Sequence, residues 1–295
     1  MIDALVKAGP EVGLRLEKIP LPKPKKGEAL IRPLLTALNQ QDASVYKWDL
    51  RAQKIGTPPF VVGQEFVGEV IAVGEEVANV KPQEIVTAWI SGQGSFAEAF
   101  CLDTNELFVV PEALPLKRAL LLSTAAIAAE ALWQQKLKDQ EILIMGAGPL
   151  GLAAILLARQ GGAKKIAIAD IVDSRLDRAL QLGADCAVNV VREVLELKSP
   201  PTLGFEMSGS PHALDTLIGQ LAPGGHAVLV GLMPGGFSPE WSAIQEKDLT
   251  VTGFHAHAPI SLFSKLQTVS TEALITDTFS YTDYALAYDL FLRGT

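Results

Sequence analysis

The sequence predicts an α/β protein in which a β-rich domain precedes a doubly wound parallel sheet. The chain has 295 residues, more than one hydrophobic core comfortably holds, and this suggests two domains. Residues 1–114 contain short β-branched runs separated by proline and glycine. From residue 141 strand-like and helix-like runs alternate, as in a parallel sheet covered on both faces. We therefore expect domains at 1–114 and 115–258, with 259–295 returning to the first domain or to the cleft between them.

In the first domain we expect short strands and no helix of any length before residue 115, and then a largely buried helix rich in alanine and leucine at 116–135. In the second domain six strands match the doubly wound fold in number. The strands are expected at 4–8, 28–35, 65–73 and 84–90, and then at 142–145, 166–169, 187–190, 204–207, 226–230 and 249–253. The helices between the later strands are expected at 150–160, 174–182, 192–197 and 212–221, and the tail from residue 260 as mostly helical.

The composition argues against several classes of protein. A formal net charge of −8 disfavours nucleic acid and anionic membrane as partners. The most apolar stretch, 119–133, is too short to cross a bilayer, and the N-terminus lacks the pattern of a signal peptide. Two cysteines, Cys101 and Cys186, provide neither a disulfide framework nor zinc-ligand spacing. We expect a cytoplasmic protein.

A glycine motif of the form G-x-G-x-x-G lies between the strand expected at 142–145 and the next helix. Gly146 allows the tight turn, Gly148 lets the backbone approach a pyrophosphate, and Gly151 permits close packing of the helix on the strand. Pro149 and Leu150 open that helix, whose free N–H groups attract phosphates. This context predicts a Rossmann dinucleotide site, the alternative being a glycine turn without a ligand.

An acidic residue, Asp170, ends the second expected strand about twenty residues after the glycines, where a carboxylate accepts the ribose hydroxyls of NAD. The same charge would repel the 2′-phosphate of NADP. Arg175 follows closely and could contact the ribose or pair with Asp170. We therefore predict NAD(H) as the cofactor.

These motifs resemble the medium-chain dehydrogenase/reductase superfamily, and within it the L-threonine and polyol dehydrogenase branch. The resemblance implies a GroES-like catalytic domain, an inserted Rossmann domain, and homodimers or tetramers that pair near residues 249–253. It adds Gly209 and Gly231 to the candidate cofactor-binding residues. The segments that carry it are 61–70 (Val-Val-Gly-Gln-Glu-Phe-Val-Gly-Glu-Val), 94–98 (Gly-Ser-Phe-Ala-Glu), 146–151 and 206–209 (Glu-Met-Ser-Gly).

The chain departs from this family where the catalytic zinc is bound. The cysteine and histidine ligands align with Asn39 and Gln64, and the third ligand with about Ser123. Glu65 alone matches the pattern, and neutral amides and a hydroxyl bind zinc poorly. The threonine and histidine of the family's proton relay are replaced by Gln41 and Ser44. The four-cysteine lobe of the family's structural zinc is also missing, and we expect no metal. A closing strand expected after Gly294 is not in the sequence, which fits either a truncated chain or a reduced domain.

Without zinc, a hydrogen-bond donor must stabilise the oxyanion that develops during carbonyl reduction. Besides Gln40, the candidate donors are Asn39, Gln41, Tyr46 and Gln64, although amides also serve to satisfy buried polar groups and Tyr46 also fits a packing role. Glu65 is a candidate general acid or a supporting residue.

His255 and His257 would face the same side of an extended segment. His257 is a candidate proton donor, whereas the pair could also form half of a metal site or part of a subunit interface.

Two functions remain open. The first is a zinc-independent NAD(H)-dependent oxidoreductase that interconverts a small carbonyl or enone with its reduced form. The second is an inactive NAD(H)-binding protein that serves as a sensor, scaffold or partner subunit. The cofactor motif fits both functions.

Overall fold

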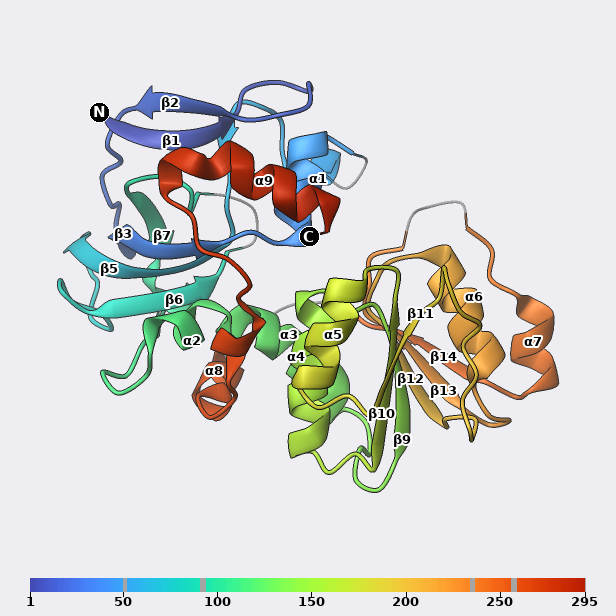
Figure 1. Cartoon of the computed structure of the whole chain (residues 1–295). Coiled ribbons are helices and arrows are strands. Elements are labelled where there is room, and N and C mark those ends of the chain that lie inside the picture. The colour runs from blue at the N-terminus through green and yellow to red at the C-terminus, as the bar shows by residue number, and fades with distance from the viewer. Residues whose placement is uncertain (50–51, 91–93, 234–236, 256–258, 295) are drawn as a thin grey trace. The chain divides into compact units, whose positions relative to one another are not determined.

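The computed structural model describes residues 1–49, 52–90, 94–233, 237–255 and 259–294. The chain divides into two units, which we call the first unit (Met1–Ser123 with Pro259–Thr295) and the second unit (Thr124–Ala258). The C-terminal segment thus belongs with the N-terminal residues (Figure 1). In the part of the chain that is described, no helix has the length and apolar character needed to cross a membrane.

The first unit contains two antiparallel sheets, and its core includes the edge-on ring pair of Phe66 and Phe100, with centroids 4.9 Å apart. One sheet has the order β2-β1-β4 and the other β7-β3-β5-β6-β8. The strands are β1 (Ile2–Lys7), β2 (Arg15–Ile19), β3 (Glu28–Ala37), β4 (Phe60–Val61), β5 (Glu65–Val73), β6 (Ile85–Trp89), β7 (Phe100–Asp103) and β8 (Phe108–Val109).

The expectation of no helix before residue 115 is wrong, because α1 spans Gln40–Lys47. Its first turn is held by a reciprocal capping box: the Asn39 side chain accepts from the backbone of Asp42, and the Asp42 side chain accepts from the backbone of Asn39. At its other end Trp48 adopts a left-handed conformation and donates its backbone N–H back into the helix. A short polar helix of this kind carries little apolar periodicity.

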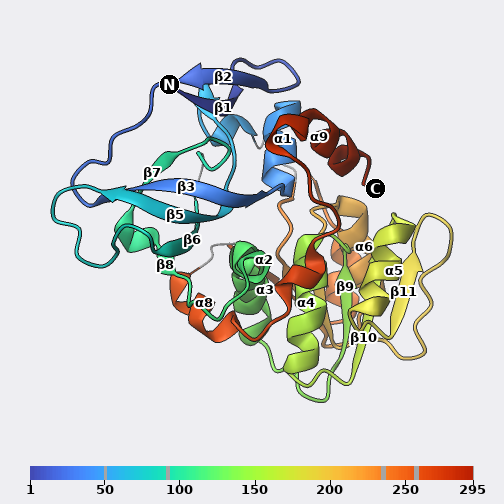
Figure 2. The ribbon, with the colours of Figure 1, turned by 60° about the vertical axis from the view of Figure 1, so that its left-hand side comes forward.

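The single helix expected at 116–135 is divided at Leu121 into α2 (Leu116–Leu120) and α3 (Leu122–Trp133). The tail is mostly helical, as expected. Its last helix, α9 (Tyr284–Arg293), lies beside α1 (Figure 1, Figure 2). The rings of Tyr46 in α1 and Tyr288 in α9 are stacked with their centroids 5.0 Å apart. The remaining helical elements of the first unit are η1 (Ala52–Lys54), η2 (Thr104–Glu106), α8 (Ile260–Leu266), η3 (Thr271–Leu274), η4 (Tyr281–Asp283) and α9 (Tyr284–Arg293).

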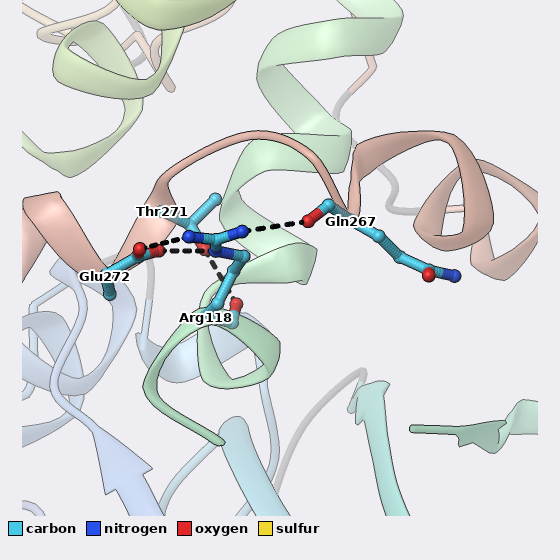
Figure 3. Close-up of polar contacts among 4 residues, drawn as sticks. All are labelled: Arg118, Gln267, Thr271 and Glu272. Atoms are coloured by element: carbon cyan, nitrogen blue, oxygen red, sulfur yellow. Dashed lines mark hydrogen bonds and ion pairs between the residues drawn. The ribbon is translucent and has the colours of Figure 1, made fainter. Parts of the chain in front are cut away.

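Arg118 in α2 forms hydrogen bonds to the C-terminal segment, residues 259–295 (Figure 3). Its Nε donates to Glu272 Oε2 at 2.8 Å, and its two terminal nitrogens contact Glu272 Oε1 and the backbone oxygen of Gln267. Thr271 Oγ1 donates to the backbone oxygen of Arg118 at 2.7 Å. A two-pronged arginine–carboxylate contact of this kind holds one orientation.

The second unit is a six-stranded parallel sheet in the order β11-β10-β9-β12-β13-β14, with α4 and α5 on one face and α6 on the other (Figure 1). The fold class predicted from the sequence is therefore confirmed. The strands are β9 (Glu141–Met145), β10 (Lys165–Asp170), β11 (Cys186–Asn189), β12 (Leu203–Glu206), β13 (His226–Leu229) and β14 (Thr250–Gly253). The helices are α4 (Pro149–Gln160), α5 (Asp173–Gln181), α6 (Pro211–Gln220) and α7 (Trp241–Glu246), in addition to α3.

The expectation of a helix at 192–197 is wrong, because these residues form a turn followed by a segment without regular secondary structure. The Asn189 side chain accepts from Val191 N at 3.1 Å, and its backbone oxygen accepts from Arg192 N and Glu193 N. Asparagine turns of this kind compete with helix formation.

Lys247 closes the C-terminal end of α6 by donating its Nζ to the backbone oxygens of Ile218, Gly219 and Leu221, at 3.2, 2.6 and 3.2 Å. A cation at this end of a helix also complements the helix dipole. We expect Lys247→Met to lower the free energy of unfolding by about 1–2 kcal/mol in urea denaturation. The exposed Lys198→Met is the matched control and should change it little; equal effects from both would contradict the capping role.

Candidate functional site

The glycine motif forms the turn between β9 and α4, as the sequence predicts. Gly146 has a φ of +103°, a value that side chains other than glycine rarely adopt. Gly148 caps α4, Pro149 and Leu150 begin it, and a Cβ added at Gly151 would lie 1.9 Å from the oxygen of Gly146. The start of α4 is therefore pressed against the turn, with its first N–H groups free of partners within the helix.

Asp170, the last residue of β10, is hydrogen-bonded to the glycine turn through its carboxylate. Its Oδ2 accepts from Ala147 N at 2.6 Å, and its Oδ1 accepts from Ile171 N and Val172 N at 2.8 and 3.0 Å. This carboxylate is held in place before any ligand arrives. Within the described part of the chain Arg175 forms no ion pair, and it is Arg192 that pairs with Asp173 on α5.

The candidate cofactor residues come together at one edge of the second unit's sheet. Gly146, Asp170, Gly209 and Gly231 lie at or just beyond the carboxyl ends of β9, β10, β12 and β13. Because the strands are parallel, these ends lie along the same edge. Doubly wound sheets bind their ligands in the crevice outside the carboxyl ends of the strands.

A second cluster of candidate residues lies in the first unit. Asn39 Oδ1 accepts from the backbone N–H groups of Gln41 and Asp42 at 2.8 and 3.1 Å, and its Nδ2 donates to Gln64 Oε1 at 3.3 Å. Gln64 is 2% exposed, and its Nε2 has no hydrogen-bond partner among the described residues. A buried amide without a partner is uncommon and indicates a place where a ligand or water binds.

Glu65 and Ser123 meet in the same unit although 58 positions separate them. Ser123 Oγ donates to Glu65 Oε1 at 2.7 Å, and both side chains are buried. The positions aligned with zinc ligands in the sequence analysis are therefore linked in two pairs, Asn39 with Gln64 and Glu65 with Ser123.

These residues do not fit a zinc ion. An amide binds zinc through its oxygen, and the side-chain oxygens of Asn39 and Gln64 both accept hydrogen bonds from the protein. The Ser123 hydroxyl donates to the only carboxylate of the set, that of Glu65. Among the described residues no group of three histidine, cysteine or acidic side chains has an arrangement that could hold a metal. Zinc requires thiolate, imidazole or carboxylate ligands, and these four residues include only one such group, the carboxylate of Glu65.

Asp42, which the sequence analysis did not single out, is buried beside this cluster. Burial raises its pKa to about 8, and the nearby charge of Glu65 acts in the same direction, although hydrogen bonds from the backbone of Asn39 and Gly63 oppose the rise. The Asn-x-x-Asp spacing from Asn39 to Asp42 resembles a capping box, and this signal could have identified both the helix and the acid.

The raised pKa of Asp42 makes stability depend on pH. Folding takes up a proton wherever the unfolded acid is ionised and the folded one is not, so the free energy of unfolding falls as pH rises from about 4 towards 8. For one proton the slope approaches about 1.4 kcal/mol per pH unit. Asp42→Asn should remove this slope in urea denaturation at several pH values. A variant with the wild-type pH dependence would contradict the assignment.

The remaining candidate residues are Tyr46, Gln41 and His257. Tyr46, a residue of α1, stacks on Tyr288 and packs against an apolar cluster of the first unit, in agreement with a packing role. Gln41 lies in the first turn of α1 and is partly exposed. His257 lies outside the described residues, and its neighbour His255 belongs to no group of three histidine, cysteine or acidic side chains that could hold a metal in the described part of the chain.

The chain is similar to known dehydrogenases over almost its whole length. Residues 25–112 match the alcohol dehydrogenase GroES-like domain, and residues 149–271 match the family described as zinc-binding dehydrogenase. An L-threonine 3-dehydrogenase from Protochlamydia amoebophila is 30% identical over 332 aligned positions, which cover 99% of this chain and 97% of the relative.

Two solved structures show the same fold with different cofactors. An alcohol dehydrogenase from E. coli CFT073, complexed with NADH, superposes with a TM-score of 0.86 at 23% identity and covers 99% of this chain and 95% of its own. A putative zinc-binding dehydrogenase from Sinorhizobium meliloti 1021, bound to NADP, gives 0.81 at 19% identity and covers 94% and 90%. The fold alone therefore leaves the choice between these cofactors open.

Proposed function

Because the chain belongs to the zinc-type alcohol and threonine dehydrogenase family of the medium-chain dehydrogenase/reductase superfamily, we propose that it is an NAD(H)-dependent oxidoreductase that works without a catalytic zinc. It interconverts a small carbonyl or enone with its reduced form. The observation that carries this proposal is the buried Nε2 of Gln64, which has no hydrogen-bond partner among the described residues. The family resemblance aligns this position with a zinc ligand.

Carbonyl reduction adds a hydride to the carbon and a proton to the oxygen. The protein must supply a strong hydrogen-bond donor at that oxygen, and solvent water supplies the proton. A bound nicotinamide supplies the hydride. Gln64 Nε2 donates to the substrate oxygen and stabilises the negative charge that develops there, which in zinc enzymes the metal would do. Asn39 orients the Gln64 amide: Asn39 Nδ2 donates a hydrogen bond to Gln64 Oε1, so that the amide keeps one orientation. Glu65, fixed by Ser123, supports the same segment.

The choice of NAD over NADP rests on Asp170. Its carboxylate is fixed by three backbone N–H groups at the end of β10, where the ribose of a bound dinucleotide lies. A 2′-phosphate there would meet a negative charge. Gly146, Gly148 and Gly151 supply the pyrophosphate turn, with Pro149 and Leu150 at the start of α4.

One observation favours the inactive alternative. Asn39 and Gln64 are hydrogen-bonded to each other, and the family resemblance aligns Gln41 and Ser44 with the positions of the proton relay. A protein that binds NAD(H) without turning over a substrate would keep the glycine turn and Asp170 and still tolerate these replacements. A homodimer or tetramer in a cytoplasmic setting stays a prediction for either function.

Both functions are tested with protein before and after removal of metal. In the purified protein, before any chelator is added, we expect far less than one zinc per chain in elemental analysis. After dialysis against a chelator we expect undiminished NADH turnover with a panel of small carbonyls and enones. Zinc near one per chain, with activity lost on its removal, would refute zinc independence. Thermal and urea unfolding with NADH then separates the alternatives, because ligand at a hundred times its Kd stabilises the fold by about 2.7 kcal/mol. Stabilisation without turnover on any substrate would favour the inactive protein.

A further inference from the structure

We propose that Glu206 is a positioning residue that shapes the nicotinamide half of the dinucleotide site. This proposal rests on the cofactor part of the proposed function and does not depend on the substrate or on zinc. Glu206 is the last residue of β12 and is fully buried. Neither the reaction nor the glycine motif accounts for a buried acid at this point.

The Glu206 carboxylate organises the turn that follows it. Its Oε1 accepts from Ser208 N at 2.8 Å and from Gly209 N at 3.0 Å, and its Oε2 accepts from Gly209 N at 3.1 Å. The Ser208 hydroxyl also donates to Oε1. Among the described residues no basic side chain pairs with Glu206, so backbone N–H groups and one hydroxyl compensate for its burial.

This turn touches the two neighbouring turns at the same edge of the sheet. A Cβ added at Gly146 would lie 2.9 Å from Ser208 N, and one added at Gly231 would lie 2.3 Å from Gly209 N and 2.5 Å from Glu206 Oε2. Gly209 itself has a φ of +70°. The turns after β9, β12 and β13 are therefore packed together without room for a side chain, and the Glu206 carboxylate lies among them.

The sheet order assigns this cluster to one half of the cofactor. From β9 the chain moves outward to β10 and β11 and then returns to β12 on the other side of β9, so the direction reverses between β9 and β12. A dinucleotide lies across such a reversal, with one mononucleotide over each half of the sheet. Asp170 marks the adenosine half, because it ends β10 and accepts ribose hydroxyls. The turns after β12 and β13 therefore lie against the nicotinamide half.

The test compares a ligand that spans both halves with one that occupies only the first. In Glu206→Gln the side chain keeps its size, but one oxygen is replaced by an NH2 group. Two donors then face each other at the Gly209 N–H, and the turn loses hydrogen bonds that hold its conformation. By isothermal titration we expect the Kd for NADH to rise about tenfold and the Kd for AMP to stay within about twofold of wild type. A general loss of structure would weaken both ligands together.

Two further variants complete the test. Ser208→Ala removes one donor and keeps the Cβ, so it should shift NADH affinity in the same direction by less; it decides the question if Glu206→Gln does not fold. Asp185→Asn is the matched control, since Asp185 accepts from Ile166 N at 2.7 Å near the start of β10, away from the carboxyl edge. It should lower stability and leave both affinities unchanged.

The outcomes separate this proposal from the proposed function. If Glu206→Gln and Ser208→Ala bind NADH as wild type does, or weaken NADH and AMP equally, Glu206 has no positioning role. If wild-type protein binds neither NADH nor AMP, the cofactor assignment itself fails. If wild type binds both ligands and the variants lose only NADH, the proposal holds whether or not any carbonyl is turned over.

Discussion

Gln64→Met is expected to lower kcat for carbonyl reduction by about a hundredfold to a thousandfold, the usual effect of removing one oxyanion donor. Methionine has nearly the volume of glutamine and no N–H group, so the cluster keeps its shape and loses the donor. The Kd for NADH should stay unchanged, because the glycine turn and Asp170 belong to the second unit. Steady-state kinetics with the best carbonyl substrate, together with NADH titration, measures both quantities.

The same substitution should make the protein more stable. Gln64 Nε2 is buried and has no hydrogen-bond partner in the part of the chain that the structure describes, and a donor in this state costs about 1–3 kcal/mol. Methionine removes that cost, while Asn39, which is partly exposed, can exchange its bond to Gln64 for one to water. Opposite changes in activity and stability are typical of a residue kept for function. Full activity in Gln64→Met, or a loss of stability, would contradict the assignment. Gln53→Met, an exposed glutamine in the first unit, is the matched control.

The second unit could be predicted from the sequence because its local signals agree with its fold. Continuous apolar runs such as Ile142–Met145 and Ile166–Ala169 are buried from both faces in a parallel sheet, and each lies in an observed strand. The glycine motif needs only a strand before it and a helix after it, and both are present. Short-range patterns were sufficient for this part of the fold.

The two wrong elements show where local pattern fails. The helix α1 depends on a capping box between Asn39 and Asp42 and on packing against α9, neither of which produces an apolar stripe in its sequence. At 192–197 the spacing of apolar residues resembles a helix, but the Asn189 side chain and backbone hold the preceding chain in a turn. In both places one side chain bonded to the backbone decides the outcome.

The first unit's candidate site was the least predictable part. Its residues could be named only through the family resemblance, because Asn39 with Gln64 and Glu65 with Ser123 are pairs separated by 25 and 58 positions. No local pattern carries information about such contacts. That Gln64 Nε2 has no hydrogen-bond partner among the described residues is likewise visible only in the folded structure.

The second large effect is expected at the glycine turn, where two glycines are required for different reasons. Gly148 has φ −69° and ψ 179°, a conformation open to any residue, and an added Cβ would meet nothing within 4 Å. Gly148→Ala should therefore fold with a free energy of unfolding within about 0.5 kcal/mol of wild type. The space beside Gly148 is nevertheless where a pyrophosphate would approach the backbone, so the stabilisation by NADH, about 2.7 kcal/mol at a hundred times the wild-type Kd, should be lost.

Gly151→Ala should behave in the opposite way. Its Cβ would lie 1.9 Å from the backbone oxygen of Gly146, and neither α4 nor the turn can yield without breaking contacts. We expect the unliganded protein to lose about 1–3 kcal/mol or more. Urea denaturation of each variant with and without NADH distinguishes the two roles, and Gly219→Ala, in α6 with open space around it, is the control that should keep the NADH effect. If Gly148→Ala retains the full stabilisation by NADH, the turn does not bind the pyrophosphate, and the cofactor assignment must be abandoned even though the fold is that of a dinucleotide-binding domain.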